Sequence, residues 1–288
     1  MRHPDYCAPD TLDEALARLS VAAGKARVIA GGTDLVVQMR AGIAHPTLLV
    51  DLRRLPLRDI RIEGGCVVLG AGLTHTQVVE SPLIAEHFPA LAAACRSIGG
   101  LPTRNRGTLG GNLVNASPAA DTAPALLVYD AEVTLAKLGS QRNLPLTEFF
   151  LGYRRTALEP DEILTEIRAP VPPPRTASIF VKMGRRNALA VSVVSAAARL
   201  TLDEAGRVAI ARLALGSVAP TPLRAVAAEA QLEGRVLDGN LIARAACEAQ
   251  ACASPISDVR ASAGYRLRMV EVLSRRALNT AWQRVGGG

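Results

Sequence analysis

The pattern of apolar and polar positions over the first 55 residues predicts a small βαβ unit. Apolar residues recur with helical spacing at 11–19, and Thr11 with an acidic residue three positions later fits a capping box at the start of this helix. Short apolar runs at 27–30 and 47–51 predict strands, with a helix over 33–40 between them. A strand, a helix and a second strand in this order form a βαβ unit.

The pattern then changes to shorter elements. Thr74 is the expected N-cap of a helix at 76–80, which leaves His75 as a solvent-facing residue of its first turn. The remaining expected strands are 59–62, 66–70, 131–138, 144–149 and 163–167. The remaining expected helices are 118–129 and 84–98, the latter with Pro89 near its start or at a break. The proline-rich run at 170–174 cannot continue a helix or a central strand, so we expect a domain boundary there.

The residues after this boundary predict an α+β domain. Three strands are expected at 177–183, 190–202 and 208–218, with a hairpin turn at 203–206. Three helices are expected to follow at 220–234, 239–254 and 259–283. A run of strands and then a run of helices indicates an antiparallel sheet covered by a small helical bundle.

Two glycine-pair loops are the candidate ligand-binding features. Residues 28–35 join an apolar run to Gly31-Gly32 and then to Thr33 and Asp34, and residues 104–121 hold Gly110-Gly111 among hydroxyl and amide side chains. Paired glycines let the backbone approach a ligand and direct several N–H groups at an anion such as a pyrophosphate. An isolated pair is more often a tight turn, and Thr33 and Asp34 have an alternative role as helix caps. Two such loops in one domain suit a long ligand with a diphosphate in its middle.

Composition narrows the function classes. The chain has 288 residues, enough for two domains, with 49% hydrophobic residues and no signal-peptide pattern or membrane-length apolar run, so we expect a cytoplasmic protein. The net charge of +7 is carried mainly by dispersed arginines, and aromatics make up only 3%. These features argue against a nucleic-acid partner and favour a solvated basic surface or a face that meets an acidic partner.

Cysteine spacing and a second glycine motif add no further site. The cysteines are odd in number, and the close pair Cys247 and Cys252 lacks the nearby third and fourth cysteine of an iron–sulfur motif, so no metal site is expected. The segment Gly70-Ala71-Gly72 has His75 where a dinucleotide fingerprint requires glycine.

The ordered motifs of the chain resemble one family, the FAD-binding medium subunit of molybdenum hydroxylases, which includes carbon monoxide dehydrogenase and xanthine dehydrogenase. The resemblance covers essentially the whole chain and rests on Ala30-Gly31-Gly32-Thr33-Asp34-Leu35, Arg104-Asn105-x-Gly107-Thr108-x-Gly110-Gly111-Asn112, Ser117-Pro118-Ala119-x-Asp121-x-x-Pro124-Ala125-Leu126 and Gly216-x-Val218-Ala219-Pro220-Thr221-Pro222-x-Arg224.

The resemblance implies an α+β fold. A two-subdomain FAD-binding domain of the p-cresol methylhydroxylase (PCMH) type would span residues 1–173, with subdomains at about 1–55 and 56–173. A C-terminal flavoprotein domain, a three-stranded antiparallel sheet plus a helical bundle, would span 174–288. Non-covalent FAD would lie between the subdomains.

The resemblance also implies which residues bind the cofactor. One loop would hold the pyrophosphate from one side through Val28, Ile29, Ala30, Gly31, Gly32, Thr33, Asp34 and Leu35, and the other loop would grip it through Thr108, Leu109, Gly110, Gly111 and Asn112. Asp121 would accept hydrogen bonds from cofactor hydroxyls, Ile98 would flank the flavin ring and Leu164 would contact it. Lys182 would sit near the polar edge of the flavin, where a cation raises the flavin potential; its alternative role is that of a surface lysine.

The chain differs from the family pattern in two features that bear on the flavin site and the redox centres. Ala188 stands where the family often has aspartate, and the cysteine-rich insertion of the 4-hydroxybenzoyl-CoA reductase branch is absent, so FAD is the expected sole redox centre of this chain. Molybdopterin and [2Fe-2S] clusters are expected on a large and a small partner subunit. The resemblance implies a heterohexamer of two heterotrimers, without nucleic acid and without a membrane span.

Other functions compete with this one. A stand-alone flavoenzyme similar to UDP-N-acetylenolpyruvylglucosamine reductase would need a catalytic serine and glutamate in its C-terminal domain, and the run from Gly216 to Pro222 fits the medium subunits better. A covalent-FAD oxidase is usually longer. A non-enzymatic nucleotide or nucleic-acid binder is suggested only by the net charge.

Overall fold

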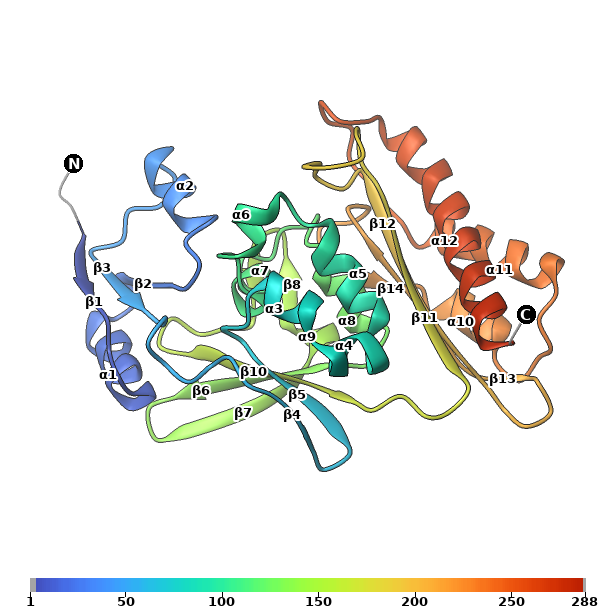
Figure 1. The fold of residues 1–288 in the computed structure, drawn as a ribbon. Coiled ribbons are helices and arrows are strands. Elements are labelled where there is room, and N and C mark those ends of the chain that lie inside the picture. Colours follow the sequence, from blue (N-terminus) through green and yellow to red (C-terminus); the bar gives the residue numbers. More distant parts are fainter. Residues whose placement is uncertain (1–3, 287–288) are drawn as a thin grey trace.

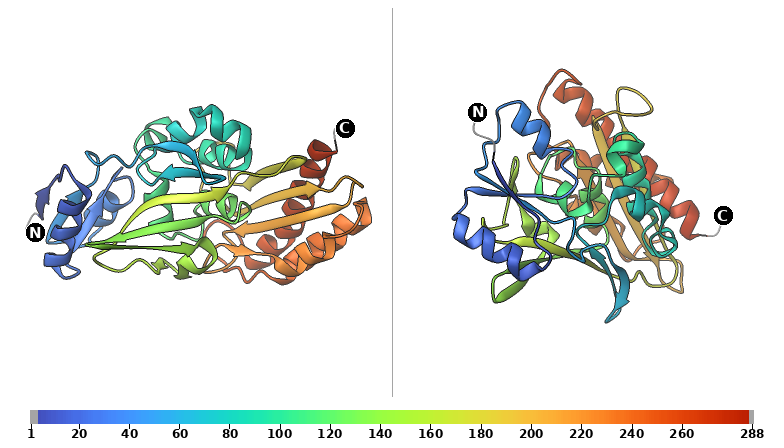
Figure 2. Two further views of the ribbon diagram at one scale, coloured as in Figure 1. Left: turned by 90° about the horizontal axis from the view of Figure 1, so that it is seen from below. Right: turned by 60° about the vertical axis from the view of Figure 1, so that its left-hand side comes forward.

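The computed structural model describes residues 4–286 and arranges them as three sheet-based units in a row, in chain order (Figures 1 and 2). Each unit has one sheet, and the sheets contain three, five and four strands, with a separate two-stranded hairpin. In this part of the chain, no helix is both long enough and apolar enough to cross a membrane.

The N-terminal unit is built on a parallel three-stranded sheet in the order β1-β3-β2. Its elements are β1 (Asp5–Cys7), α1 (Leu12–Ala22), β2 (Ala26–Ile29), α2 (Leu35–Arg40) and β3 (Leu48–Asp51). The expected βαβ unit is therefore present, and β1 adds a strand that is too short for periodicity to reveal. The N–H of Glu14 donates to Oγ1 of Thr11 at 3.2 Å, but the Glu14 carboxylate accepts from the N–H of Asp10, so the capping box is only half formed.

The middle unit has an antiparallel sheet in the order β4-β5-β10-β6-β7. Its strands are β4 (Ile60–Glu63), β5 (Cys66–Gly70), β6 (Glu132–Lys137), β7 (Ser140–Pro145), β10 (Ile163–Pro170) and the hairpin β8 (Phe150–Gly152) with β9 (Arg155–Thr156). Its helices are α3 (His75–Glu80), α4 (Pro82–His87), α5 (Pro89–Ser97), α6 (Leu101–Arg104), α7 (Leu109–Val114), α8 (Thr122–Leu127) and α9 (Leu146–Phe149).

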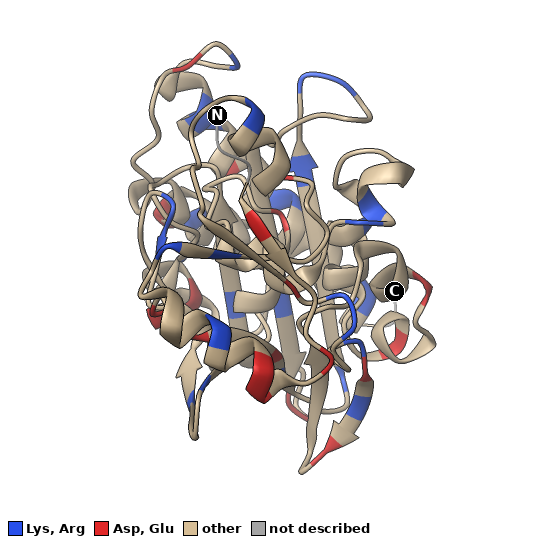
Figure 3. Ribbon diagram, turned by 90° about the vertical axis from the view of Figure 1, so that its left-hand side faces the viewer, with Lys and Arg blue, Asp and Glu red and all other residues tan. Residues whose placement is uncertain are grey.

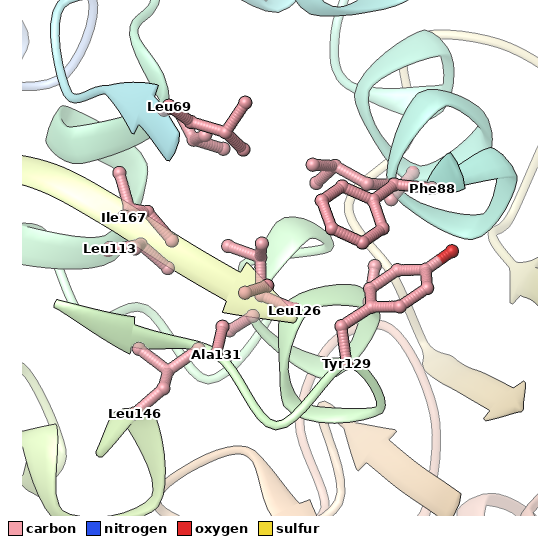
Figure 4. Close-up of a cluster of buried hydrophobic side chains, with 14 of the residues drawn as sticks. Leu69, Phe88, Leu113, Leu126, Tyr129, Ala131, Leu146 and Ile167 are labelled. Carbon is pink, nitrogen blue, oxygen red and sulfur yellow. The ribbon is translucent and has the colours of Figure 1, made fainter. Parts of the chain in front are cut away.

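The helices of the middle unit pack on their sheet around a large apolar core. Figure 4 shows Phe88 and Tyr129 side by side in this core, and their ring centroids are 4.4 Å apart. Leu69 and Ile167 reach the core from the sheet, and Leu126 reaches it from α8. These residues are fully or almost fully buried, and their burial is the main driving force for folding of the unit.

The C-terminal unit is an antiparallel sheet in the order β11-β12-β13-β14 with helices on its far side. Its elements are β11 (Thr176–Met183), β12 (Val194–Leu202), β13 (Val208–Gly216), β14 (Leu223–Arg224), α10 (Val226–Leu232), α11 (Gly239–Ala251) and α12 (Ala263–Val285). Helices α5 and α8 of the middle unit pack on one face and α12 packs on the other, so every residue of β12 is buried.

Several expected elements are wrong in detail. The helix expected at 84–98 is divided in two at Pro89, where a break was one of the expected outcomes, and its first part begins earlier, at Pro82. The strand expected at 144–149 ends at Pro145, and residues 146–149 form α9 instead. The C-terminal sheet has a fourth strand, the two-residue β14. Helices α10 and α12 begin at Val226 and Ala263, later than expected, whereas α11 begins at Gly239 as expected. His75 is buried, with 2% of its surface exposed, rather than solvent-facing.

Candidate functional site

A cleft of about 570 Å³ lies between the N-terminal and middle units. This volume is in the range of small-molecule and cofactor sites. All the residues that line the cleft fall between Arg27 and Leu164, so the C-terminal unit contributes none of them. Both glycine-pair loops border the cleft, although they are about eighty positions apart in the sequence. The cleft is therefore the candidate functional site.

The first glycine loop offers unused backbone donors to the cleft. Gly31 packs against the other loop so closely that a Cβ added there would lie 1.9 Å from the carbonyl oxygen of Arg106, and Gly32 has a φ of +75°. Among residues 4–286, no acceptor is recorded for the N–H groups of residues 31–35, and the Asp34 side chain makes no capping bond. Backbone N–H groups in such a turn form an anion-binding concavity.

The second glycine loop has already used most of its donors. The N–H of Leu109 donates to Leu73 O and that of Gly110 to Ala71 O, both at 2.8 Å. The N–H groups of Gly111 and Asn112 both donate to Thr108, the first to Oγ1 and the second to the carbonyl oxygen. This loop therefore supplies a close-fitting wall and the Thr108 hydroxyl more than it supplies backbone donors.

The structure brings fourteen of the seventeen sequence-predicted residues to the cleft. The fourteen are Val28, Ile29, Ala30, Gly31, Gly32, Thr33, Asp34, Leu35, Ile98, Thr108, Gly110, Gly111, Asn112 and Leu164. Leu109 is instead a fully buried core residue, and Asp121 and Lys182 lie outside the lining.

Asp121 and Lys182 form a buried ion pair behind Ile98. Lys182 Nζ lies 2.6 Å from Asp121 Oδ2 and donates to the carbonyl oxygen of Ser97 at 3.1 Å. Asp121 also accepts hydrogen bonds from the hydroxyls of Ser97 and Ser192. Burial raises the pKa of the Asp121 carboxyl, and the positive charge of Lys182 opposes that rise. Because β11 supplies Lys182 and the middle unit supplies Asp121, the pair also ties two units together.

Arginines make the cleft a basic environment. Arg27, Arg58 and Arg106 line it without an ion-pair partner or side-chain acceptor among residues 4–286. Arg53 is instead bound to Asp51, whose pKa is raised by burial but lowered overall by hydrogen bonds from Arg53 and Tyr6. Figure 3 shows basic and acidic positions interspersed over this end of the molecule. The unpaired arginines favour an anionic ligand in the cleft.

His75 is a lining residue that sequence reasoning missed. It is the first residue of α3 after a capping box formed by Thr74 and Gln77, and its N–H donates to Gly107 O at 3.1 Å. Burial lowers the pKa of the imidazole to about 4, and the positive charge of Arg104 adds to the effect. The imidazole is therefore neutral near pH 7. The only sequence signal that could have identified His75 as a lining residue is its position just after Gly70-Ala71-Gly72.

The site is organised for an organic anion rather than a metal ion. Within the described part of the chain, no group of three or more histidine, cysteine or carboxylate side chains could hold a metal. The carboxylate of Glu162, which lines the cleft, is engaged by Arg142 at 2.7 Å and 2.9 Å. Free N–H groups, unpaired arginines and close-fitting glycines suit a ligand that carries phosphates.

Family comparisons match both parts of the chain. Residues 2–172 match the FAD binding domain in molybdopterin dehydrogenase, and residues 179–281 match the CO dehydrogenase flavoprotein C-terminal domain. The carbon monoxide dehydrogenase medium chain of Hydrogenophaga pseudoflava is 34% identical over 282 residues, covering 97% of each chain. The nicotinate dehydrogenase FAD-subunit of Eubacterium barkeri is 37% identical over 242 residues, covering 82% of each.

Solved structures agree with these matches. A carbon monoxide dehydrogenase chain from Hydrogenophaga pseudoflava superposes with a TM-score of 0.95 at 35% identity and covers 98% of each chain. A chain of quinoline 2-oxidoreductase from Pseudomonas putida 86 gives a TM-score of 0.92 at 31% identity, covering 99% of this chain and 98% of the other. The protein therefore belongs to the family of FAD-binding medium subunits of molybdenum hydroxylases, as an oxidoreductase flavoprotein subunit.

Proposed function

We propose that this subunit binds FAD non-covalently in the cleft and relays electrons within a molybdenum hydroxylase complex. The electrons would come from [2Fe-2S] clusters on a small partner subunit, which receive them from the molybdopterin site of a large partner subunit. The final acceptor would be a quinone, oxygen or NAD. The observation that carries the proposal is the cleft between two facing glycine loops, with unused N–H groups on the first loop.

The cleft fits FAD because its lining combines unused backbone donors on the first loop with apolar residues such as Ile98 and Leu164. Residues 31–35 would hold the diphosphate, and Arg106 would add positive charge beside it. Ile98 and Leu164 would flank the flavin ring, because apolar side chains suit contact with an aromatic ring. Bound FAD would supply the acceptance and release of electrons, while the protein sets its orientation and environment.

We assign Asp121 and Lys182 a supporting role behind the flavin. The two side chains form an ion pair with each other, so direct contact of either one with the cofactor would require that ion pair to break. Ser97 accepts a hydrogen bond from Lys182 and precedes Ile98, so the pair would hold the backbone of a residue that borders the flavin.

The assembly we propose is a heterotrimer with one large and one small partner, paired into a heterohexamer. Its test is co-expression with the partner subunits, followed by measurement of the mass of the purified complex. Anaerobic addition of the hydroxylase substrate should bleach the flavin in the complex and leave the flavin of the isolated subunit unchanged. Bleaching of the isolated subunit by the same substrate would favour a stand-alone flavoenzyme.

Flavin binding itself is tested by the absorbance spectrum of the purified chain before and after acid precipitation. Flavin bands released into the supernatant, with the mass of FAD, are the expected result. Bands that stay in the pellet would indicate covalent attachment, and no flavin even after addition of FAD would contradict the proposal.

Gly111→Val should prevent the chain from retaining FAD. The valine side chain would enter the cleft beside Thr108 Oγ1, which lies 2.8 Å from an added Cβ. Gly239→Val, where an added Cβ meets nothing within 4 Å, is the matched control.

A further inference from the structure

His75 presents an unpaired imidazole where the two glycine loops meet. Only 2% of its surface is exposed, yet it lines the cleft. Its Nδ1 is buried without a hydrogen-bond partner. No partner within residues 4–286 is recorded for Nε2 either, and Nε2 is not among the enclosed atoms, so it is the ring nitrogen with access to the cleft.

Neighbouring contacts fix the position of the ring. The capping box of α3 and the bond from the His75 N–H to Gly107 O hold the backbone. A Cβ placed on Gly107 would lie 3.2 Å from His75 Cδ2 and 3.4 Å from Thr33 Oγ1. Since Nε2 is bonded to Cδ2 in the ring, the Nε2 edge lies on the side of Gly107 and Thr33. This edge therefore borders the same part of the cleft as the unused N–H groups of the first loop.

The charge state of the ring follows from its surroundings. The nearby charge is that of Arg104, which donates to the carbonyl oxygens of Ile98 and Gly99, and the desolvated site disfavours a further cation. A neutral imidazole carries one N–H. A buried N–H without an acceptor costs more than a buried lone pair, so the favoured tautomer protonates Nε2 and directs that N–H to the cleft.

We propose that His75 is a cofactor-binding residue whose Nε2–H donates a hydrogen bond to a diphosphate oxygen of the bound dinucleotide. This inference rests on the proposed FAD function. It names a donor from α3 in addition to the two glycine loops, and it explains why a histidine is buried here without a protein partner. Thr33 and the first-loop N–H groups would bind neighbouring oxygens of the same diphosphate.

The test compares three substitutions in the full-length apo-chain. His75→Gln can place an amide N–H near the position of Nε2, His75→Asn reaches only the Nδ1 position, and His75→Phe keeps a ring without donors. Loss of a hydrogen bond to a charged acceptor should weaken FAD binding about tenfold or more in the Asn and Phe variants. The Gln variant should stay close to the wild type. His87→Gln, outside the cleft, is the control.

Ligands with and without phosphates separate this role from simple packing. The dissociation constants of FAD, ADP and riboflavin are measured by calorimetry or flavin fluorescence, and circular dichroism checks folding. We expect FAD and ADP to lose affinity in His75→Phe and riboflavin to be unaffected. Equal losses for all three ligands, or equal losses in the Gln and Phe variants, would overturn the proposal. A wild-type chain that binds no FAD would overturn the proposed function as well, whereas unchanged FAD affinity in His75→Phe would overturn this inference alone.

Discussion

At the scale of single residues, buried ionisable groups are where sequence reasoning was least informative. The capping of α3 by Thr74 is readable from the sequence, and the structure confirms it. The burial of His75, one position later, is not readable, because it depends on Gly107 and Arg104 from a segment about thirty residues away. Local periodicity contains no information about such a contact.

The buried imidazole should make the stability of the FAD-free chain depend on pH. Its pKa is about 4 in the folded chain against 6.5 ordinarily, so between these values the unfolded chain binds the proton first. The contribution of His75 to the free energy of unfolding is therefore complete above about pH 6.5 and is lost as the pH falls toward 4. The wild type should lose on the order of 3 kcal/mol more than His75→Phe over this range. Urea unfolding at a series of pH values measures the difference, and parallel curves would contradict it.

The Asp121–Lys182 pair should be costly to break from one side. Lys182→Met leaves the carboxylate of Asp121 buried without its cation, which should lower the free energy of unfolding by about 3–5 kcal/mol. The double variant Lys182→Met/Asp121→Asn removes both charges and should recover most of that loss.

The control for this prediction is Lys137→Met. Lys137 is paired with Glu159 and Asp161 at the surface, so its loss should change stability little. Denaturant unfolding of all four chains gives the comparison. A double variant no more stable than Lys182→Met alone would contradict the view that the uncompensated Asp121 carboxylate causes the loss.

At the scale of elements, the predictions succeeded where apolar residues recur locally and failed where prolines or distant contacts decide. The apolar run at 66–70 and the partly alternating run at 208–218 correctly indicated strands, although the second strand ends at Gly216. Leu146 and Phe149 were assigned to a strand, but they lie three positions apart and both are buried, which is the spacing of a helix. Pro89, where a helix start or break was expected, begins α5.

The candidate site, like the secondary structure, could be predicted from the sequence only in part. The two glycine loops are visible in the sequence because each sets a glycine pair beside hydroxyl and polar side chains, and the structure brings them to one cleft. The sequence did not show that only the first loop keeps its N–H groups free. It depends on Leu73 and Ala71, whose carbonyl groups take up the N–H groups of Leu109 and Gly110.

The contact between the loops should be intolerant of even one methyl group. In Gly31→Ala the new Cβ would overlap the carbonyl of Arg106, so the loops must separate. We expect destabilisation by about 1–3 kcal/mol and a loss of FAD affinity of about tenfold or more. Calorimetry with FAD measures the affinity.

Gly239→Ala is the matched control for the loop contact. It makes the same change at a position with open space around the added Cβ, and it should leave FAD binding unaltered. Wild-type affinity in Gly31→Ala would mean that the cleft does not depend on close contact between the loops.

At the scale of the whole molecule, Asp130 links the middle and C-terminal units. It follows α8, has a φ of 53°, and its carboxylate accepts hydrogen bonds from Arg199, Arg212 and Arg224 on three strands of the C-terminal sheet. Burial raises the pKa of Asp130, but these arginines lower it overall. The cluster should therefore make the two units unfold together.

Asp130→Asn tests this coupling, because asparagine tolerates the left-handed backbone and lacks the charge. The carboxylate is 37% exposed, so we expect a loss of only about 1–3 kcal/mol, smaller than for a fully buried pair. Differential scanning calorimetry should show the single transition of the wild type broadening or separating into two. Asp203→Asn, which removes an exposed pair with Arg207, should leave a single transition. A single sharp transition in Asp130→Asn would place the coupling in the apolar contacts of α5 and α8.

The confinement of the cleft to residues between Arg27 and Leu164 has a consequence for the order of events during translation. Chains are synthesised from the N-terminus and their domains generally fold as units in that order. Leu164, the last lining residue, leaves the ribosome before β11, which packs on α5, and before β12 and β13, which pack on α8. The nascent chain can thus complete its cofactor cleft while the apolar surface of α5 and α8 is still open. Flavin bound at that stage would stabilise the surface on which the C-terminal unit then folds.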